Sequence, residues 1–316
     1  MSTSVTLPQH WTPLQRLKNH AIYYSIRVLW TFLTLLPSSI QRGLCTLFSK
    51  LAYQLARRER RLAVRHLMKA FPKLTQSEAK RLSQDMFTHF GESIFELLNL
   101  EASVNQCLKE PQNRFALEAL KQGLSEKAGA IVVTGHIGNW ELMAQAFSCA
   151  GFPISSVAKP IYDPRLTRWV DHFRGRYGMK TLWRGQSESF KSILRVFRDQ
   201  ETFGILIDQD TKVPGDFVPF FGDMAFTPTA AATLHRRTGA PVLVGCHQRI
   251  DNAHRLKLLR VDPESSVDDP NFDRDFTALL TKHLEEAIRE VPAQWVWLHR
   301  RWRTRPVDSI QELGEN

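Results

Sequence analysis

His136 and Glu141 are the two residues whose types and spacing first point to chemistry. They lie in the segment 135–142, which Thr134 separates from the apolar run 130–133. The run is short and β-branched, which predicts a buried strand, and the residues after Glu141 favour a helix. His136 is therefore expected at the carboxyl end of a strand, where the active-site crevices of open α/β sheets form.

A carboxylate that hydrogen-bonds one ring nitrogen of a histidine fixes its tautomer and leaves the other nitrogen to act as a base. His136 assisted by Glu141 could then take a proton from an alcohol without a covalent enzyme intermediate. Gly135 and Gly138 let the backbone turn tightly and leave space around the imidazole. The same pattern also fits a histidine that caps the start of the helix, with Glu141 interacting with the helix dipole.

The segment Gly135-His136-Ile137-Gly138-Asn139-Trp140-Glu141 resembles the signature of the lipid A biosynthesis acyltransferases. This family contains the lauroyl- and myristoyl-transferases of Gram-negative envelopes. Like the glycerolipid acyltransferases, it carries a histidine and an acid separated by four residues. Further blocks that resemble the family occur in its order, over about residues 65–306. The resemblance implies that His136 is the general base and that Glu141 orients it.

Two basic residues of the middle region, Lys159 and Arg174, also match the family. Lys159 and Pro160 follow a strand predicted over 153–158, where a family member usually has a basic residue and a proline. Arg174 lies in a segment that resembles the family's arginine-containing segment before a glycine. The resemblance makes Arg174 a candidate for contact with anionic substrate or with the developing oxyanion. An arginine that interacts with the dipole at a helix end explains its position equally well.

Asp208, Gln209 and Asp210 follow the continuous apolar strand predicted over 203–207. They resemble the acid-Gln-acid block that shapes the site in the family. Two acids separated by one residue could also bind a metal, but no His, Cys or further Asp cluster completes such a site, so we expect none. The following residues, 214–222, are rich in proline and glycine and predict a loop whose exposed aromatic side chains suit contact with an acyl chain.

The carboxyl-terminal segment 292–302 resembles the end of the family domain, where an aromatic strand leads into His-Arg-Arg. Arg300 and Arg301 occupy the two arginine positions. The resemblance makes them candidates for contact with substrate phosphate. A solvated basic tail is the alternative.

The amino-terminal region predicts contact with a membrane. The apolar segment Ala21–Leu36 would span about 24 Å as a helix, short of a hydrocarbon core of about 30 Å, and Arg27 lies in its middle. A buried helix fits this segment, but Tyr23, Tyr24 and Trp30 favour an interfacial or barely spanning anchor. An amphipathic helix over 40–55 then leads into five arginines that suit anionic lipid headgroups: Arg57, Arg58, Arg60, Arg61 and Arg65.

The composition of the chain favours some classes of binding partner and argues against others. The chain has 316 residues and a net charge of +10, so an acidic partner is expected. Little aromatic interleaving and no recognisable nucleic-acid motif argue against DNA or RNA. The four cysteines have no paired spacing, which indicates reduced thiols and gives no zinc pattern.

Helices are further predicted over 79–100, 113–124, 163–177, 229–238 and 271–290, and strands over 241–245 and 256–261. We therefore predict an α/β fold: a single acyltransferase domain over 63–306, with a mostly parallel central sheet flanked by helices. Membrane-associated helices over 1–62 precede it, and a polar tail over 307–316 follows.

The resemblance implies transfer of a fatty acyl chain from an acyl-carrier-protein thioester to a hydroxyl of a lipid A precursor, a phosphorylated glycolipid. The reaction needs no cofactor, and the expected place is the cytoplasmic face of the inner membrane, in contact with its lipids. Two alternatives remain open. One is the same fold acting with acyl-CoA or on another acceptor, such as a glycolipid or an ornithine lipid. The other is a non-catalytic basic protein that binds membranes.

Overall fold

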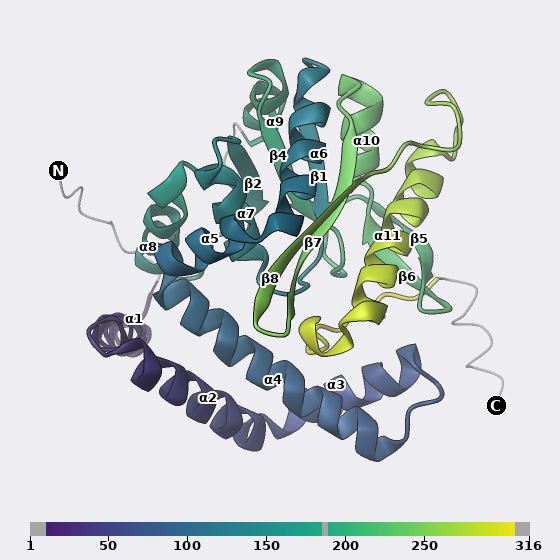
Figure 1. Ribbon diagram of the computed structural model, residues 1–316. Coiled ribbons are helices and arrows are strands. Elements are labelled where there is room, and N and C mark those ends of the chain that lie inside the picture. Colours follow the sequence, from purple (N-terminus) through teal and green to yellow (C-terminus); the bar gives the residue numbers. More distant parts are fainter. Residues whose placement is uncertain (1–10, 185–188, 307–316) are drawn as a thin grey trace.

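The computed structural model describes residues 11–184 and 189–306, and it has the expected α/β architecture, with helices on both faces of a mostly parallel sheet (Figure 1). The sheet has six strands in the order β3-β2-β4-β1-β7-β8. Only β8 runs antiparallel to its neighbour. The strands are β1 (Ala130–Thr134), β2 (Ile154–Ala158), β3 (Lys180–Trp183), β4 (Thr202–Leu206), β7 (Val242–Ile250) and β8 (Ala253–Arg260).

Eleven α-helices are described. Those after the first strand are α7 (Trp140–Cys149), α8 (Pro164–Arg174), α9 (Ser189–Arg198), α10 (Ala230–Thr238) and α11 (Phe272–Glu290). Those before it are α1 (Pro13–Thr34), α2 (Ser38–Leu55), α3 (Arg57–Ala70), α4 (Gln76–Leu98), α5 (Leu100–Lys109) and α6 (Arg114–Ser125). Short 3₁₀ turns cover Pro111–Asn113, Gly175–Tyr177 and Pro292–Gln294.

The central strand β1 is buried on both faces, as its continuous apolar sequence predicts. Ile131 and Val133 pack in the larger core with α9, α10 and α11. Val132 points to the opposite face and packs with α6 and α7. Because β1 lies between β4 and β7, its carboxyl end is in the middle of the sheet edge.

The amino-terminal helices α1 to α4 lie along one end of the domain (Figure 1). Thr75 caps the start of α4 and forms a capping box with Glu78. The helix α3 runs through residue 62, the expected boundary between the membrane-associated region and the acyltransferase domain. The polar tail predicted over 307–316 lies outside the described residues.

Many apolar side chains of α1 and α2 are exposed to solvent. Val28 is 66% exposed, Phe32 54% and Leu55 81%. One edge of α1 packs against α8, where Trp30 meets Trp169 edge to face at 5.1 Å. Within the described residues, no helix is both long enough and apolar enough to cross a bilayer.

The loop prediction for residues 214–222 is wrong. This segment forms a two-stranded hairpin of β5 (Gly215–Phe220) and β6 (Asp223–Pro228). Phe220 and Phe221 are buried in the larger core and are not exposed for contact with an acyl chain. The proline and glycine residues that indicated a loop lie at the ends, the turn and the open edge of the hairpin.

The aromatic strand expected near the carboxyl end is also absent from the described chain. Residues 292–294 form a 3₁₀ turn, and only Trp295 makes an isolated bridge, to Ile137. Trp295 and Trp297 are fully buried and meet edge to face at 4.6 Å. This segment therefore supports the loop that carries His136. The sequence patterns also missed β3, α5 and α9.

Candidate active site

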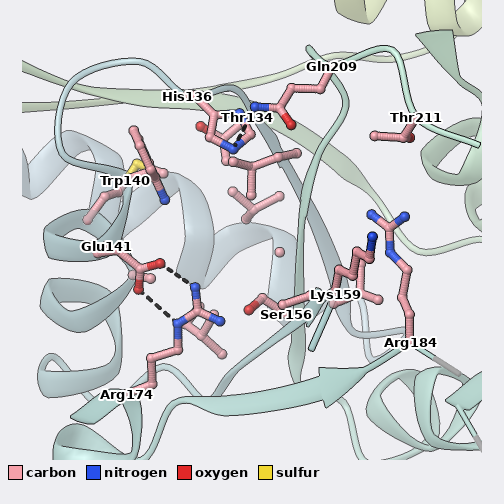
Figure 2. A pocket seen from close by; sticks show the side chains of 18 of the residues that line it. Thr134, His136, Trp140, Glu141, Ser156, Lys159, Arg174, Arg184, Gln209 and Thr211 are labelled. Atoms are coloured by element: carbon pink, nitrogen blue, oxygen red, sulfur yellow. Dashed lines mark hydrogen bonds and ion pairs between the residues drawn. The ribbon is translucent and has the colours of Figure 1, made fainter. Parts of the chain in front are cut away.

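Two loops meet at the carboxyl edge of the sheet. β1 and β4 are parallel neighbours, with Thr134 in register with Leu206, so residues 135–139 and 207–213 leave the sheet side by side. They border a cavity of about 800 Å³ that extends between the sheet, α7 and α8 (Figure 2).

The imidazole of His136 is oriented by Asp208. Its Nδ1 lies 2.8 Å from Asp208 Oδ1, and its main-chain nitrogen donates to Oδ2 at 2.6 Å. Because an ionised carboxylate only accepts hydrogen bonds, Nδ1 carries the proton. The Nε2 atom is then the basic nitrogen. It faces the cavity and lies 3.3 Å from the side-chain nitrogen of Gln209 (Figure 2).

Asp208 and His136 each stabilise the charged form of the other. Burial raises the pKa of the Asp208 carboxyl, but the charge of His136 and hydrogen bonds from His136 and Trp295 outweigh it and hold that pKa at about 2. Trp295 Nε1 donates to Oδ2 at 2.7 Å. Burial lowers the pKa of His136, yet the charges of Asp208 and Glu141 and the Asp208 hydrogen bond raise it above its ordinary 6.5.

Glu141 does not hydrogen-bond His136, so the expected pairing is wrong. Its carboxylate instead forms a two-point ion pair with Arg174, whose Nε donates at 2.9 Å (Figure 2). The side chain that contacts the imidazole from α7 is Trp140, which meets it edge to face at 4.8 Å. Glu141 therefore acts on His136 only through its charge, while it holds Arg174 in the wall of the same cavity.

The turn that carries His136 depends on Gly138. This residue has φ +62°, and a Cβ there would lie 1.9 Å from the carbonyl oxygen of His247. Its main-chain nitrogen donates to the carbonyl of Gln294 at 2.8 Å, and Val296 donates to the carbonyl of His136 at 3.2 Å. The turn is thus fixed on both sides by main chain.

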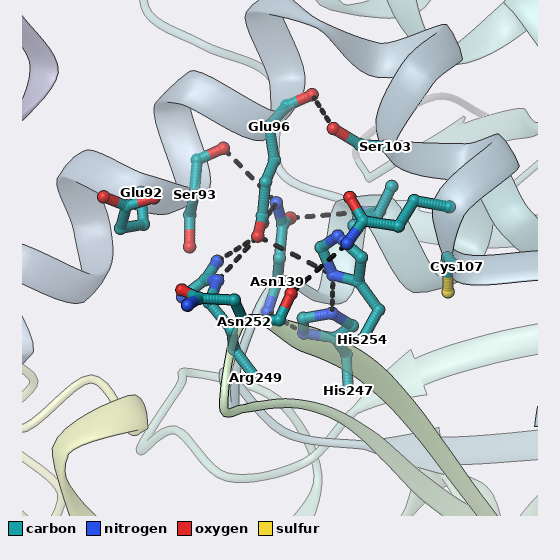
Figure 3. A network of polar contacts seen from close by, with 12 residues as sticks. Glu92, Ser93, Glu96, Ser103, Cys107, Asn139, His247, Arg249, Asn252 and His254 are labelled. Atoms are coloured by element: carbon teal, nitrogen blue, oxygen red, sulfur yellow. Dashed lines mark hydrogen bonds and ion pairs between the residues drawn. The ribbon is translucent and has the colours of Figure 1, made fainter. Parts of the chain in front are cut away.

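A buried polar network lies beneath this turn (Figure 3). The main-chain nitrogen of Asn139 donates to His247 Nδ1 at 2.9 Å, and its side-chain amide donates to Glu96 at 2.8 Å. Asn139 also caps α7 by accepting from Leu142. Glu96 pairs with Arg249, so α4 and β7 hold the start of α7 together.

The cavity changes from polar to apolar with depth. His136, Glu141, Arg174 and Gln209 lie in its polar part. Lys159 is exposed and lines the cavity at its solvent end. Buried apolar side chains line the other end: Val132, Met143, Phe147, Ile154 and Met179.

Of the three remaining predicted residues, only Asp210 lines the cavity, whereas Arg300 and Arg301 do not. Asp210 lines the cavity, and its carboxylate is held by Arg303 at 3.0 Å and by Thr304. Arg300 is exposed and does not line the cavity. Arg301 is completely buried and donates to Phe226 and Thr227 of β6, and burial lowers its pKa to about 10. The expectation that Arg301 meets phosphate is therefore wrong, because this arginine anchors the hairpin to the carboxyl-terminal segment.

Within residues 11–184 and 189–306, no group of three or more His, Cys, Asp or Glu side chains is arranged to hold a metal ion. The chemistry available at the cavity is a histidine base with a carboxylate partner, next to an apolar recess.

Comparison with known proteins identifies the family. Residues 10–304 match the family described as bacterial lipid A biosynthesis acyltransferase. The chain belongs to this family. It is therefore an O-acyltransferase.

Relatives of this acyltransferase are named for different lipids. It is 26% identical to a lipid A biosynthesis lauroyltransferase of Escherichia coli, over 96% of this chain and 95% of the relative. It is 24% identical to a lipid A biosynthesis palmitoleoyltransferase of the same organism, over 90% and 92%. A phosphatidylinositol mannoside acyltransferase of Mycolicibacterium smegmatis is 25% identical over 66% of this chain and 67% of its own length.

Sequence reasoning placed Asp208 in the acyltransferase site but missed its pairing with His136. The sequence does contain one signal: both residues come within three positions after a predicted buried strand, and neighbouring parallel strands end at one edge of a sheet. The strand order that brings β1 next to β4 has no local signature. Trp295, the other partner of Asp208, gave no signal beyond its place in an aromatic segment.

Proposed function

We propose that this acyltransferase moves a fatty acyl chain from an acyl-carrier-protein thioester to a hydroxyl of a lipid A precursor. The observation that carries the proposal is the position of His136 Nε2. This nitrogen faces a cavity whose inner end is apolar, and Asp208 holds the opposite ring nitrogen at 2.8 Å. The two relatives from Escherichia coli are named as lipid A biosynthesis acyltransferases, and each aligns with this chain over nearly its whole length. They support lipid A precursor as the acceptor.

In the proposed reaction, His136 Nε2 removes the proton of the acceptor hydroxyl as its oxygen attacks the thioester carbonyl. A C–O bond forms, and the carbonyl electrons move to its oxygen. When the tetrahedral intermediate collapses, the C–S bond breaks and the imidazolium returns the proton to the leaving thiolate. Asp208 stabilises the imidazolium during this cycle, as the raised pKa of His136 supports.

Two donors are placed to stabilise the negative oxygen of the intermediate. The amide of Gln209 lies 3.3 Å from the basic nitrogen, next to the reacting atoms. Arg174 lines the same cavity and is held by Glu141. A preorganised donor of this kind is typically worth about 10²–10³ in rate.

The proposed location is the cytoplasmic face of the inner membrane, with α1 and α2 lying in the lipid interface. Their exposed apolar side chains support this, and so do the arginines at the start of α3. The cavity is close to this surface, because α8 packs on α1 and also carries Arg174. An acceptor with several acyl chains can then remain in the bilayer while its headgroup reaches His136.

A second acceptor class is favoured by one relative. The phosphatidylinositol mannoside acyltransferase is named for a different glycolipid, and it aligns with two thirds of this chain. The acyl donor could be a carrier-protein thioester or acyl-CoA. The net charge of +10 favours an acidic carrier protein over a small thioester.

An assay with two donors and two acceptors tests the proposal. The purified full chain is incubated with lauroyl carrier protein or lauroyl-CoA, and with lipid A precursor or phosphatidylinositol mannoside in mixed micelles. Mass spectrometry of the lipid is expected to show one added acyl group on the lipid A precursor, fastest with the carrier protein. Faster transfer to the mannoside would replace the acceptor, and faster transfer from CoA would replace the donor.

A further inference from the structure

We infer that Lys159, Arg184 and Lys212 form a phosphate-binding subsite at the solvent end of the cavity. The inference rests on the proposed function. It extends that function to the side chains that bind a phosphate of the substrate next to the acyl recess. The ligand would be a phosphate ester, carried by the donor's phosphopantetheine arm or by the glycolipid acceptor.

The first observation is an excess of positive charge in the cavity. Of its two carboxylates, Glu141 is paired with Arg174, and Asp210 is paired with Arg303. The other three cations of the lining, Lys159, Arg184 and Lys212, have no ion pair within the described parts of the chain. All three are exposed, so water solvates them until an anion arrives.

The second observation is how strand register places two of these cations. β2 and β3 are parallel, with Ala158 in register with Trp183, so Lys159 and Arg184 leave the sheet at adjacent positions. The main-chain nitrogen of Arg184 donates to the carbonyl of Ala158 at 2.9 Å, which continues the ladder to that point. Figure 2 shows both side chains reaching into the cavity, away from the Glu141–Arg174 pair.

The third observation is an unused hydroxyl opposite them. Thr211 lies in the loop after β4, next to Lys212, and lines the same cavity. Its side-chain oxygen is buried and has no hydrogen-bond partner among the described residues. A buried hydroxyl without a partner costs free energy unless a ligand or water satisfies it.

These groups match phosphate chemistry. A phosphate ester offers several strongly accepting oxygens, to which a guanidinium, two amines and a hydroxyl can donate. A carboxylate would use fewer of these donors. A phosphate held here would leave the acyl chain or the acceptor hydroxyl extending toward His136, because both ends belong to one cavity.

The test compares ligands that differ only by phosphate. The full chain and its K159Q/R184Q/K212Q variant are titrated with a dodecyl thioether of phosphopantetheine and with the same thioether of pantetheine. They are also assayed with a phosphorylated glycolipid acceptor and with its phosphatase-treated form. A matched control is K109Q/K121Q/K282Q, which removes three charges that do not line the cavity.

Each cation lost should reduce the preference for the phosphorylated ligand by about tenfold, and the control should keep the wild-type preference. Collapse of the preference in the thioether titration places the donor's phosphate in the subsite. Collapse in the acceptor comparison places the acceptor's phosphate there. Unchanged preference in both comparisons overturns the inference.

Two further outcomes distinguish phosphate binding from carrier-protein binding and from failure of the proposed reaction. If the triple variant raises KM for the intact carrier protein but keeps both phosphate preferences, the cations bind acidic side chains of the carrier, and the inference is wrong. If the wild type transfers no acyl chain to any acceptor, the proposed function fails. The thioether titration still reports phosphate recognition in that case, because it requires no turnover.

Discussion

Asp208 receives two hydrogen bonds from a single residue, His136, which lies 72 positions earlier in the chain. One comes from the imidazole Nδ1 at 2.8 Å and the other from the main-chain nitrogen at 2.6 Å. The carboxylate therefore fixes both the ring orientation and the backbone from which the ring extends. It also selects Nε2 as the nitrogen that faces the cavity.

This relationship predicts a pH effect. The active base is the neutral imidazole, so kcat/KM should rise with pH through the pKa of His136, which lies above 6.5. Asp208→Asn removes the charge that raises this pKa, so the rise should move to lower pH. The rate on the plateau should nevertheless fall by about 10²–10⁴, because the imidazolium loses its stabilising partner. A pH–rate profile of both proteins checks the shift. A rise at unchanged pH would show that Asp208 does not set the basicity of His136.

Glu141 should behave differently from Asp208. Glu141→Gln breaks the pair with Arg174 in the cavity wall, where the side chains are 18% and 14% exposed. The free energy of unfolding should drop by about 1–3 kcal/mol, since an unpaired charge remains partly buried. The E141Q/R174M double variant should recover part of that loss while staying poorly active. Urea denaturation of E141Q, R174M and the double variant measures the coupling energy between Glu141 and Arg174. Additive losses would mean that Glu141 and Arg174 are not energetically coupled.

Gly204 is expected to set the usable length of the acyl chain. It lines the cavity in register with Val132 on one side and Ser156 on the other. A Cβ at this position would meet no atom closer than 3.8 Å, so a side chain fits and fills the recess. Gly204→Val should lower kcat/KM for the longest accepted chain by about tenfold or more, relative to a chain shorter by several methylene groups. Competition between the two donors, read by mass spectrometry, measures the ratio. The control Gly43→Val, in open space on α2, should leave the ratio unchanged.

The proposed membrane surface can be tested without deleting a helix. Val28→Glu with Phe32→Glu places charges on exposed positions of α1 and should weaken binding to anionic vesicles about tenfold or more. The matched control is Phe115→Glu with Leu259→Glu, which changes exposed apolar residues of α6 and β8. Vesicle co-sedimentation measures both. Equal losses in the two variants would argue that net charge alone, and not the α1 surface, controls binding.

Local sequence is enough to place His136, because a β-branched run followed by a glycine-rich turn and a helix has one usual geometry. The carboxylate partner cannot be predicted in that way. Glu141 is near in sequence but points into the wall toward Arg174, whereas Asp208 is brought close by the strand order β4-β1. The prediction for Arg301 is wrong for a related reason: its partners belong to the hairpin, whose proline and glycine content favours a loop.

The most direct test of the central claim is the acyl-transfer rate of His136→Ala. The turn that carries His136 is held by Gly138, Asn139 and main-chain bonds, so the variant should fold with an unchanged circular dichroism spectrum. Mass spectrometry of the acceptor should show transfer reduced by about 10²–10⁴ at mildly alkaline pH, where the wild-type base is largely neutral. Transfer within about tenfold of the wild-type rate, by a folded His136→Ala protein, would contradict the assignment of His136 as the base.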